Sequence, residues 1–352
     1  VVMLDSTGSP TGDRMAVDWA AQPATVALHR GNGLVEAVGP GRAELTARTP
    51  WDSTTRATIL VPPDLVYSHV GKTAAGRGYA ELRGVELRTG ATSSLTGMEA
   101  VDAQAAISPD RTRIAFVRRA GPGEQNIWVM DADGQNAHDV TPDPVDEKGP
   151  FWAADGRALF YIAATTGQGE RRFMAETDGG NPRPFLSDTF SVASGAASPD
   201  GRYLAYSTLR AAKYDLYRVP LSTTGPLAPN GGERKLWSRP NRDYLLPQYA
   251  RASGDLFFIQ RERGGKSSQI LMRLAADAAE PQAVSPSGLQ ILSFAVAPDG
   301  HQVVAVAAKP GSTIREPKTA LYFLDARQIG AAIPQPWREE TGVTFATPAF
   351  TP

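Results

Sequence analysis

Short apolar runs follow a recurring polar turn along most of this chain. The turns read Ser-Pro-Asp, Ala-Asp-Gly or Ser-Gly, and the apolar runs after them begin at Ile114, Leu159, Leu204, Leu256 and Val303. The successive spacings are therefore 45, 45, 52 and 47 residues. Repeats of this length built from short strands are typical of β-propellers, in which each repeat is a four-stranded sheet.

One repeat shows the pattern of its four strands clearly, at 105–107, 113–117, 126–130 and 137–141, with an Asp133-Gly134 turn before the last. The same order of strands and turns follows in 151–186, 192–237, 246–284 and 291–333. A sixth repeat is divided between the two ends of this region, with its first strand at 343–350 and the others at 65–68, 79–87 and 93–96. Pairing of these ends would leave no free sheet edge between them. The sequence thus predicts an all-β chain whose residues 62–352 form a six-bladed propeller.

Residues 1–61 also alternate but have no such repeat. Ala43, Leu45 and Ala47 fall on one face of a predicted strand and polar residues fall on the other, which is the period of a half-buried strand. Asn32-Gly33 predicts a hairpin turn. Pro62-Pro63 ends strand pairing and stiffens a linker. We expect a small β-sandwich at 1–61, with too little chain before Asp5 to supply its first strand.

Two family resemblances agree with these patterns. The order of Trp19, Gly33-Leu34-Val35 and Gly39-Pro40-Gly41 resembles the bacterial immunoglobulin-like domains of group 2, which are exported spacers or adhesive modules, although Arg42 stands where that family usually has Thr or another small polar residue. The segment 126–141 and its copies at 215–219 and 320–325 resemble TolB-like propeller repeats, and the likeness extends over 64–352. This second resemblance implies a ring that binds protein partners at its faces and channel.

Composition removes several classes of function. Lys and Arg number 36 against 37 Asp and Glu, so the formal net charge of −1 gives no field that would attract nucleic acid or an anionic membrane. The absence of Cys excludes disulfides and thiolate chemistry. No apolar run approaches the roughly 20 residues that span a bilayer. With the resemblances, these points predict a periplasmic or extracellular location, with anchoring through a segment before Val1.

Motifs for catalysis or metal binding are weak. Asp131-Ala132-Asp133-Gly134 looks like the start of a calcium loop, but it lacks the later Glu, and a similar sequence forms a predicted turn in the next repeat. The four His residues, at positions 29, 69, 138 and 301, show no metal-ligand spacing. Neither a Gly-x-Ser-x-Gly nucleophile elbow nor a phosphate loop is present. The sequence therefore predicts no cofactor, no metal and no enzymatic activity.

Polar residues gather just where the innermost strand of each predicted blade begins, which places them at one mouth of the propeller channel. The predicted partner-binding residues are Asp102, Asp146, Glu147, Asp188, Arg242, Asp243, Tyr244 and Glu339. Because carboxylates dominate, a basic or amide-rich peptide or loop of a protein partner is the expected ligand. The predicted function is a protein-binding or scaffold module of the bacterial cell envelope. Two alternatives stay open, a structural subunit of a membrane-associated assembly and a lyase or hydrolase acting in the channel.

Overall fold

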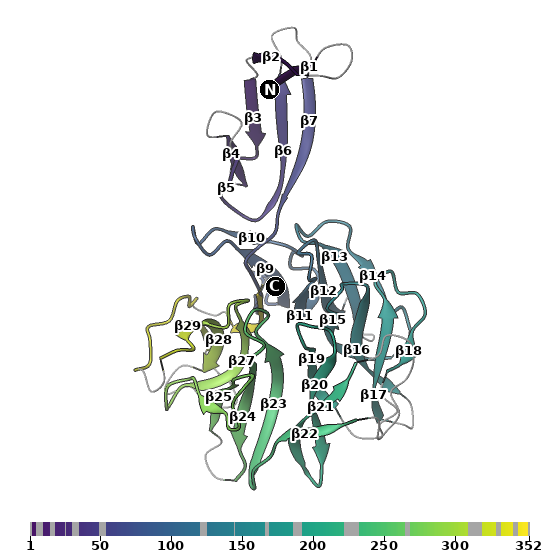
Figure 1. The fold of residues 1–352 in the computed structure, drawn as a ribbon, viewed down its shortest axis with the longest axis vertical. Helices are drawn as coiled ribbons and strands as arrows, with labels where there is room; N and C mark the ends of the chain where they lie inside the picture. The colour runs from purple at the N-terminus through teal and green to yellow at the C-terminus, as the bar shows by residue number, and fades with distance from the viewer. Residues whose placement is uncertain are drawn as a thin grey trace.

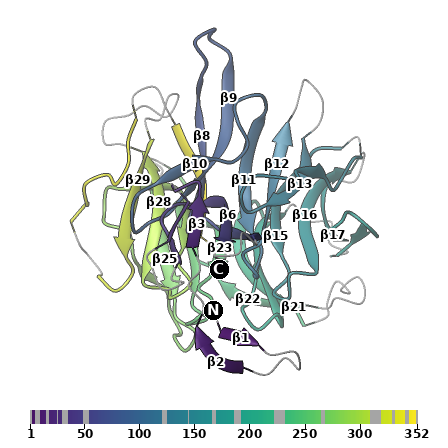
Figure 2. The ribbon, with the colours of Figure 1, turned by 90° about the horizontal axis from the view of Figure 1, so that it is seen from above.

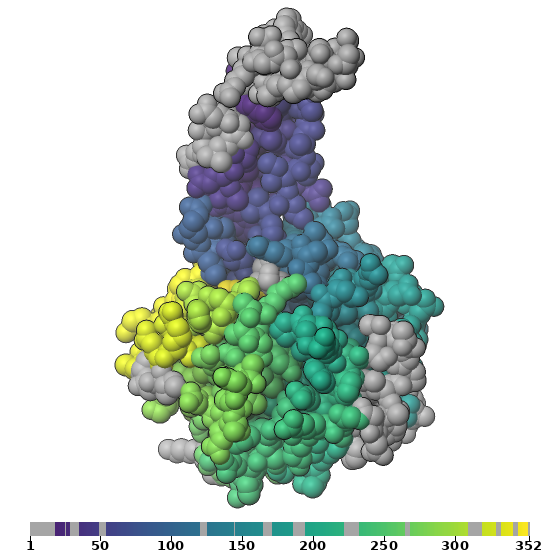
Figure 3. Space-filling model, viewed as in Figure 1, coloured from purple at the N-terminus to yellow at the C-terminus, as the bar shows by residue number. Residues whose placement is uncertain are grey.

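A computed structural model describes most of the chain in detail. The described residues are 2–4, 10–14, 18–24, 26–29, 35–48, 54–119, 125–143, 145–165, 169–185, 192–221, 232–264, 268–308, 319–328, 332–340 and 344–350. All regular elements among them are β-strands, so the all-β class is confirmed. They form a ring of sheets with a smaller N-terminal segment standing on one end of the ring (Figures 1 and 3).

The N-terminal segment contains three small sheets. Strands β1 (Val2–Leu4) and β2 (Pro10–Arg14) pair with each other, as do β4 (Ala27–His29) and β5 (Val35–Ala37). The third sheet has the order β3 (Asp18–Gln22), β6 (Gly41–Arg48), β7 (Thr54–Val61). The predicted alternation in β6 is confirmed in part, since Ala43 is buried and Glu44 is exposed, whereas Leu45, Thr46 and Ala47 are all half-buried. The predicted Asn32-Gly33 turn lies outside the described residues, and the immunoglobulin-like sandwich stays a prediction.

The rest of the chain forms sheets of antiparallel strands set side by side around an axis (Figure 2). Three sheets have four strands each, in chain order: β15 (Glu147–Trp152), β16 (Ala158–Thr165), β17 (Gly169–Glu176), β18 (Arg183–Pro184); β19 (Val192–Ala197), β20 (Tyr203–Arg210), β21 (Lys213–Pro220), β22 (Arg234–Trp237); β23 (Arg242–Tyr249), β24 (Leu256–Glu262), β25 (Gln269–Leu274), β26 (Gln282–Ala283). A fourth sheet has three strands: β27 (Gln290–Val296), β28 (Gln302–Ala308) and β29 (Thr319–Asp325).

The remaining strands join in one eight-stranded sheet. Its members are β8 (Leu65–Lys72), β9 (Gly78–Val85), β10 (Thr92–Ser94), β11 (Val101–Ile107), β12 (Arg113–Arg119), β13 (Asn126–Asp131), β14 (His138–Asp139) and β30 (Thr344–Phe350). The predicted pairing of the two ends is confirmed, because β30 lies antiparallel to β8 with Phe350 opposite Leu65. Most buried apolar clusters of the ring lie between neighbouring sheets, and one of them joins residues of β8, β28 and β30; another lies within the eight-stranded sheet.

Two details differ from the six equal sheets that the sequence predicts. A parallel pair, Val101 with Ala80, joins β11 to β9, so the sheets on either side of it are not separate. In the last repeat, a fourth strand was expected near Ile333. Among the described residues an isolated bridge between Leu321 and Arg338 stands in its place.

The recurring polar turns are built as structural units. In the first, the Ser108 hydroxyl donates to Asp110 at 2.6 Å and accepts the Arg113 N–H at 2.9 Å. The Asp200 turn repeats these bonds through Ser198 and Tyr203. Hydrogen bonds from hydroxyl and backbone groups lower the pKa of Asp110 and of Asp200, although burial opposes this at Asp110. The interpretation of these residues as turn-formers is supported.

A second set of turns fits against the preceding sheet. Gly134 has φ +88°, and a Cβ there would lie 2.3 Å from the carbonyl oxygen of Leu95. Gly179 has φ +87° and is equally close to Val140, at 2.5 Å. Glycine is required at both positions by the left-handed backbone and by this contact. The turns therefore help to set the distance between neighbouring sheets.

Arg42 connects the N-terminal segment to the ring. Its guanidinium donates to Asp133 at 2.6 Å and to Asp131 at 3.2 Å. The neighbouring contacts are made by Arg88 and Thr89, which donate to the carbonyl oxygens of Ala37 and Val38. The sequence Asp131-Ala132-Asp133-Gly134, which looks like a calcium loop, thus holds an arginine. Arg42, the residue that differs from the immunoglobulin-like pattern, is thus a contact between the N-terminal segment and the ring.

Each innermost strand, namely β11, β15, β19, β23, β27 and β30, carries a shift of register relative to its partner. Such shifts mark β-bulges, which bend a strand and redirect its side chains. Left-handed residues stand in four of these bulges: Gln104 (φ 54°), Gly149 (φ 62°), Leu246 (φ 52°) and Thr347 (φ 38°). Three of the four are not glycine, so the surrounding contacts must offset backbone strain.

Hydrogen bonds connect these bulges around the axis. The Gln104 N–H donates to the Thr347 hydroxyl at 3.1 Å, and the Gly149 N–H donates to the Gln104 side chain at 2.6 Å. On the other side of the ring, the Leu246 N–H donates to the Ser194 hydroxyl at 2.9 Å. A side chain of one innermost strand thus satisfies a backbone group that the bulge of the next innermost strand releases.

The junction of the two ends can be tested at Phe345, which is 1% exposed and packs against Tyr67 with ring centroids 5.6 Å apart. Replacing Phe345 with Ala should lower the free energy of unfolding by about 3–5 kcal/mol, because it leaves a cavity. Phe345→Leu, which keeps most of the volume, should cost less than half of this. Denaturant unfolding with unchanged m-value measures both. Equal, small effects of the two variants would show that β30 does not support the ring.

The bulge network can be tested at Thr347, whose hydroxyl also bonds with Ser68 at 2.8 Å. Thr347→Val keeps the branched shape and the backbone preference but leaves the Gln104 N–H without its acceptor. We expect a loss of about 1–3 kcal/mol in unfolding free energy. Thr344→Val in the same strand is the control. Indistinguishable unfolding midpoints for the two variants would contradict the role assigned to the hydroxyl.

Candidate functional site

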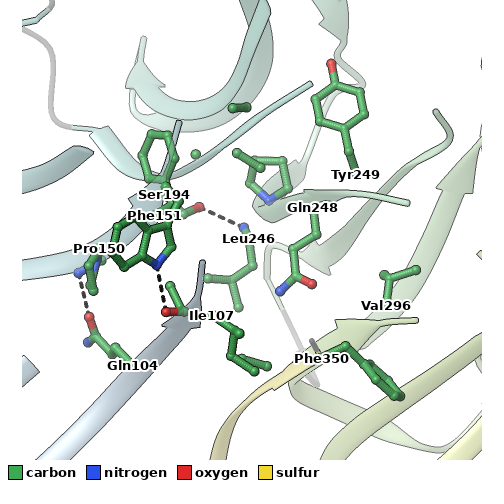
Figure 4. Close-up of a pocket in the computed structure, with 18 of the residues that line it drawn as sticks. Gln104, Ile107, Pro150, Phe151, Ser194, Leu246, Gln248, Tyr249, Val296 and Phe350 are labelled. Carbon is green, nitrogen blue, oxygen red and sulfur yellow. Dashed lines mark hydrogen bonds between the residues drawn. The ribbon is translucent and has the colours of Figure 1, made fainter. Parts of the chain in front are cut away.

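A cavity of about 670 Å³ runs along the axis of the ring and is lined by all six innermost strands. Its volume lies within the range of small-ligand and peptide sites. Figure 4 shows side chains of these strands around a common space, with Gln104 and Ile107 from β11, Phe151 from β15 and Leu246 from β23. The bulges lie at the level where the cavity begins, and the recurring turns ring its far mouth.

The walls of the cavity are largely apolar. Three prolines each follow a left-handed residue of a bulge, and further prolines of the turns line the mouth; they are Pro150, Pro247, Pro348, Pro109, Pro199 and Pro298. Aromatic rings complete the walls, at Phe151, Trp152, Tyr214, Tyr249, Phe294 and Phe350. Burial raises the pKa of Tyr249 to about 12. Rigid rings and prolines lose little conformational entropy when a ligand binds.

The charges of the cavity are of one sign. Among the described residues that line it, Lys148 and Arg251 are the charged ones, and both are cations. Arg251 lies at the mouth that the turns surround and donates to the carbonyl oxygen of Pro109 at 3.4 Å. The sequence predicts a channel dominated by carboxylates.

Asp102 and Asp243 are buried within the sheets. Asp102 accepts two hydrogen bonds from Arg118 of the adjacent strand, at 2.8 and 2.9 Å. Asp243 accepts two from Arg261, at 2.6 and 3.2 Å, and another from the Tyr214 N–H of the preceding sheet at 3.0 Å. Neither residue lines the cavity. Both carboxylates hold strands together at the level where the innermost strands begin.

Glu147 is also buried, with 1% of its surface exposed. Its carboxylate accepts hydrogen bonds from the Thr141 hydroxyl and, at 3.4 Å, from the Ile127 N–H of the preceding sheet. Burial raises the pKa of Glu147 to about 8, although these hydrogen bonds oppose the rise. The side chain is therefore mainly protonated at neutral pH. It bonds across the boundary between two sheets, as Asp243 does.

The other predicted site residues differ in burial and in bonding partners. Asp146 is exposed and accepts the Gln125 N–H at 3.1 Å, and Arg242 forms an ion pair with Glu262. Tyr244 is buried against Phe258. Glu339 is exposed, whereas Asp188 lies outside the described residues. No described member of the predicted set lines the cavity, and their partner-binding role stays a prediction.

Sequence reasoning missed the residues that do line the cavity. A signal for them exists, because Gly149-Pro150, Leu246-Pro247 and Thr347-Pro348 occupy the same position in three innermost strands. Proline within a strand marks a bulge or an edge. The repetition of X-Pro three or four residues before the polar turns could therefore have pointed to redirected side chains at the axis.

A buried histidine lies away from the cavity. His69 is 3.0 Å from Glu340 through Nε2 and 3.4 Å from Glu81 through Nδ1, and it stacks on Tyr79. These contacts fasten the segment before β30 to β8. Within the described ranges, no group of three or more His, Cys, Asp or Glu side chains is placed to hold a metal ion. The same part of the chain contains no helix that is long and apolar enough to cross a membrane.

Comparison with known proteins supports the fold. No protein-family model matches the chain. TolB from Acinetobacter baumannii superposes with a TM-score of 0.65 at 13% identity, covering 89% of this chain and 80% of that one. Hydrazine synthase of Kuenenia stuttgartiensis gives a TM-score of 0.62 at 13% identity, covering 83% of this chain and 47% of that one. The fold is therefore that of a TolB-like β-propeller.

The sequence itself resembles part of a peptidase. The uncharacterized peptidase YuxL of Bacillus subtilis is 28% identical over 99 residues, which make up 27% of this chain and 15% of that protein. The match thus spans a small part of the relative's length. It overturns the prediction that this protein is not an enzyme, which rested on missing motifs, because related sequence occurs in a peptidase and the fold occurs in a synthase.

The raised pKa of Glu147 generates a prediction about stability. Between its usual value of 4.5 and the folded value of about 8, the unfolded chain loses this proton while the folded chain keeps it. The group therefore lowers stability as pH rises through this window, by up to about 1.4 kcal/mol per pH unit, and has no such effect below it. Glu147→Gln imitates the protonated acid. It should unfold like the parent at pH 4 and be more stable at pH 8.

Denaturant unfolding at pH 4, 6 and 8 measures the difference between the two proteins. Asp146→Asn, which changes an exposed carboxylate next in the chain, is the control and should show no such trend. A constant difference between the Gln variant and the parent at all three pH values would mean that Glu147 is ionised in the folded protein.

Proposed function

We propose that this protein is a binding module of the bacterial cell envelope, in which a six-bladed propeller holds a segment of a protein partner in its axial cavity. The observation that carries the proposal is the cavity itself, with rigid apolar walls from six strands and few polar groups. Sites of this composition are the usual binding sites of folded proteins. The likeness to TolB supports the same kind of module.

The six-bladed division is part of this proposal. Separating the eight-stranded sheet at its single parallel pair gives two four-stranded groups, and the other four sheets bring the number to six. The domain boundaries at 1–61 and 62–352 and the periplasmic or extracellular location belong to the proposal as well. In this arrangement Arg42 fixes an immunoglobulin-like domain beside the ring, where it serves as a spacer or a second contact.

The partial match to a peptidase favours a peptide as the chemical class that enters the cavity. A flexible peptide segment can enter a cavity of this volume, whereas a folded domain can only cover its mouth. In a second candidate function, the propeller holds a peptide for cleavage. If this second function is correct, short peptides should bind with an affinity similar to that of an intact partner.

The test fills the cavity without changing the outer surface. Ala196, which lines the cavity on β19, is replaced with Trp, and Ala74→Trp in an exposed turn is the control. The immobilised full chain and both variants are exposed to a solubilised envelope extract of the source organism, and retained proteins are quantified by mass spectrometry. We expect the parent and the control to retain the same partner and Ala196→Trp to lose at least nine-tenths of it.

Unchanged unfolding midpoints establish that all three proteins are folded. Equal retention by the parent and Ala196→Trp would contradict binding in the cavity. A double variant, Asp146→Asn with Glu339→Gln, tests the mouth that the sequence predicts. If only this double variant loses the partner, the binding site lies at the beginning of the innermost strands and not in the cavity.

A further inference from the structure

One residue at the cavity mouth breaks the pattern of the repeats. The first residue of each polar turn donates its N–H to the carbonyl five residues later, as Ser108 does to Arg113 and Ser198 to Tyr203. Ala250 makes the same bond with Asp255, at 2.9 Å. Arg251 therefore occupies the position that Pro109 and Pro199 hold in other repeats. A long cation replaces a short apolar residue there.

The side chain of Arg251 extends across the mouth. It donates to the carbonyl oxygen of Pro109, which stands at the equivalent position after β11. Around the ring, β15 and β19 separate β11 from β23 on one side, and β27 and β30 separate them on the other. The two turns thus lie on opposite sides of the axis, and both line the cavity. A ligand that enters by this mouth must pass the guanidinium.

The guanidinium has donors to spare. Arg251 is exposed, and within the described residues it makes this one long hydrogen bond and no ion pair. A guanidinium offers five N–H donors arranged to bind a carboxylate through two of them. The carboxylates nearby are engaged elsewhere: Asp102 and Asp243 pair with arginines inside the sheets, and Asp110 and Asp200 of the turns accept hydrogen bonds from Ser108 and Ser198 of their own turns. The guanidinium is therefore available to an anionic group.

The space behind Arg251 favours apolar groups. Tyr249, Val296 and Phe350 line the cavity near the ends of their strands, and prolines of the turns adjoin them. Pro cannot donate a backbone hydrogen bond, so these walls offer few partners for polar groups. A ligand that complements the site carries a carboxylate beside an apolar side chain. This chemistry differs from the basic segment that the sequence predicts.

We propose that the mouth at Arg251 binds an acidic segment of a partner polypeptide, in which an Asp or Glu side chain pairs with Arg251 and a neighbouring apolar side chain enters the cavity. The proposal rests on the proposed function, because it assigns the chemistry of a ligand for the same cavity. An internal segment of a partner can place both groups at the mouth without threading the ring. The charge pair with Arg251 therefore gives specificity for an acidic segment, and burial of its apolar side chain in the cavity contributes most of the affinity.

The test uses three pools of N-acetylated hexapeptides with apolar residues at the other positions. The first pool has one Glu and an amidated C-terminus. The second has Gln in its place, and the third has Gln with a free C-terminal carboxylate. Each pool is passed over the immobilised full chain, and retained peptides are quantified by mass spectrometry. We expect the Glu pool to be retained at least tenfold more than the amidated Gln pool, as a charge-assisted hydrogen-bonded pair allows.

Variants of the full chain identify the cation. Arg251→Gln should remove the preference for Glu, and Arg251→Lys should keep part of it, since a lysine retains the charge without the paired geometry. Arg202→Gln is the matched control, because Arg202 stands in the equivalent turn of another repeat and its side chain is 79% exposed. The preference of the parent should also fall when salt is raised. Unchanged unfolding midpoints show that the variants are folded.

The outcomes separate the two proposals. Equal retention of the Glu pool and the amidated Gln pool would leave the proposed function standing and overturn the role of Arg251. Preferential retention of the third pool alone would identify a chain terminus as the ligand and overturn the assignment to an acidic side chain. If no pool is retained by the parent chain, the assignment to an acidic side chain fails, whereas the proposed function fails only if Ala196→Trp retains the intact partner as the parent does. A preference for Glu that survives Arg251→Gln would also overturn the assignment.

Discussion

The ring depends on innermost strands that each bond to two sheets at once. Within its own sheet, such a strand pairs with its neighbour until a bulge interrupts the register. At the bulge and at its beginning, it bonds to another sheet, as when Ser194 accepts the Leu246 N–H and Asp243 accepts the Tyr214 N–H. These bonds satisfy backbone groups that would otherwise be buried without partners. Neighbouring sheets are therefore held by directed bonds as well as by apolar packing.

This requirement also determines the character of the cavity. Asp102, Glu147 and Asp243, at the beginning of innermost strands, are buried in the sheets, where arginines, a hydroxyl or backbone N–H groups bond to them and offset the cost of burial. The bulges then turn proline and aromatic residues toward the axis. The cavity is left apolar, with Lys148 and Arg251 as the charged residues among its described lining. The same features that stabilise the ring thus give the cavity apolar walls and cationic side chains.

The turns were well predicted because their conformation depends on residues next to one another. Asp and Ser bond to the backbone of their own turn, and Gly134 permits its left-handed conformation. Strand positions followed from the alternation of apolar residues, and β8 and β30 were correctly paired. The site residues could not be found in this way. The Asp102 side chain could point toward the axis or toward Arg118 of the adjacent strand. The bulge and the partner strand decide between these directions, and a local sequence pattern shows neither of them.

The sequence by itself determined an all-β chain, the length of its repeat and the meeting of its two ends. These features depend on strand propensity and on the spacing of apolar residues, which can be read directly from neighbouring positions in the sequence. The tertiary structure alone decided which side chains reach the axis, that Arg42 fastens the N-terminal segment to Asp131 and Asp133, and that Arg251 crosses the mouth to Pro109. The physical reason is distance along the chain. Arg251 and Pro109 are separated by 142 residues, and only the curvature of the whole ring brings them together.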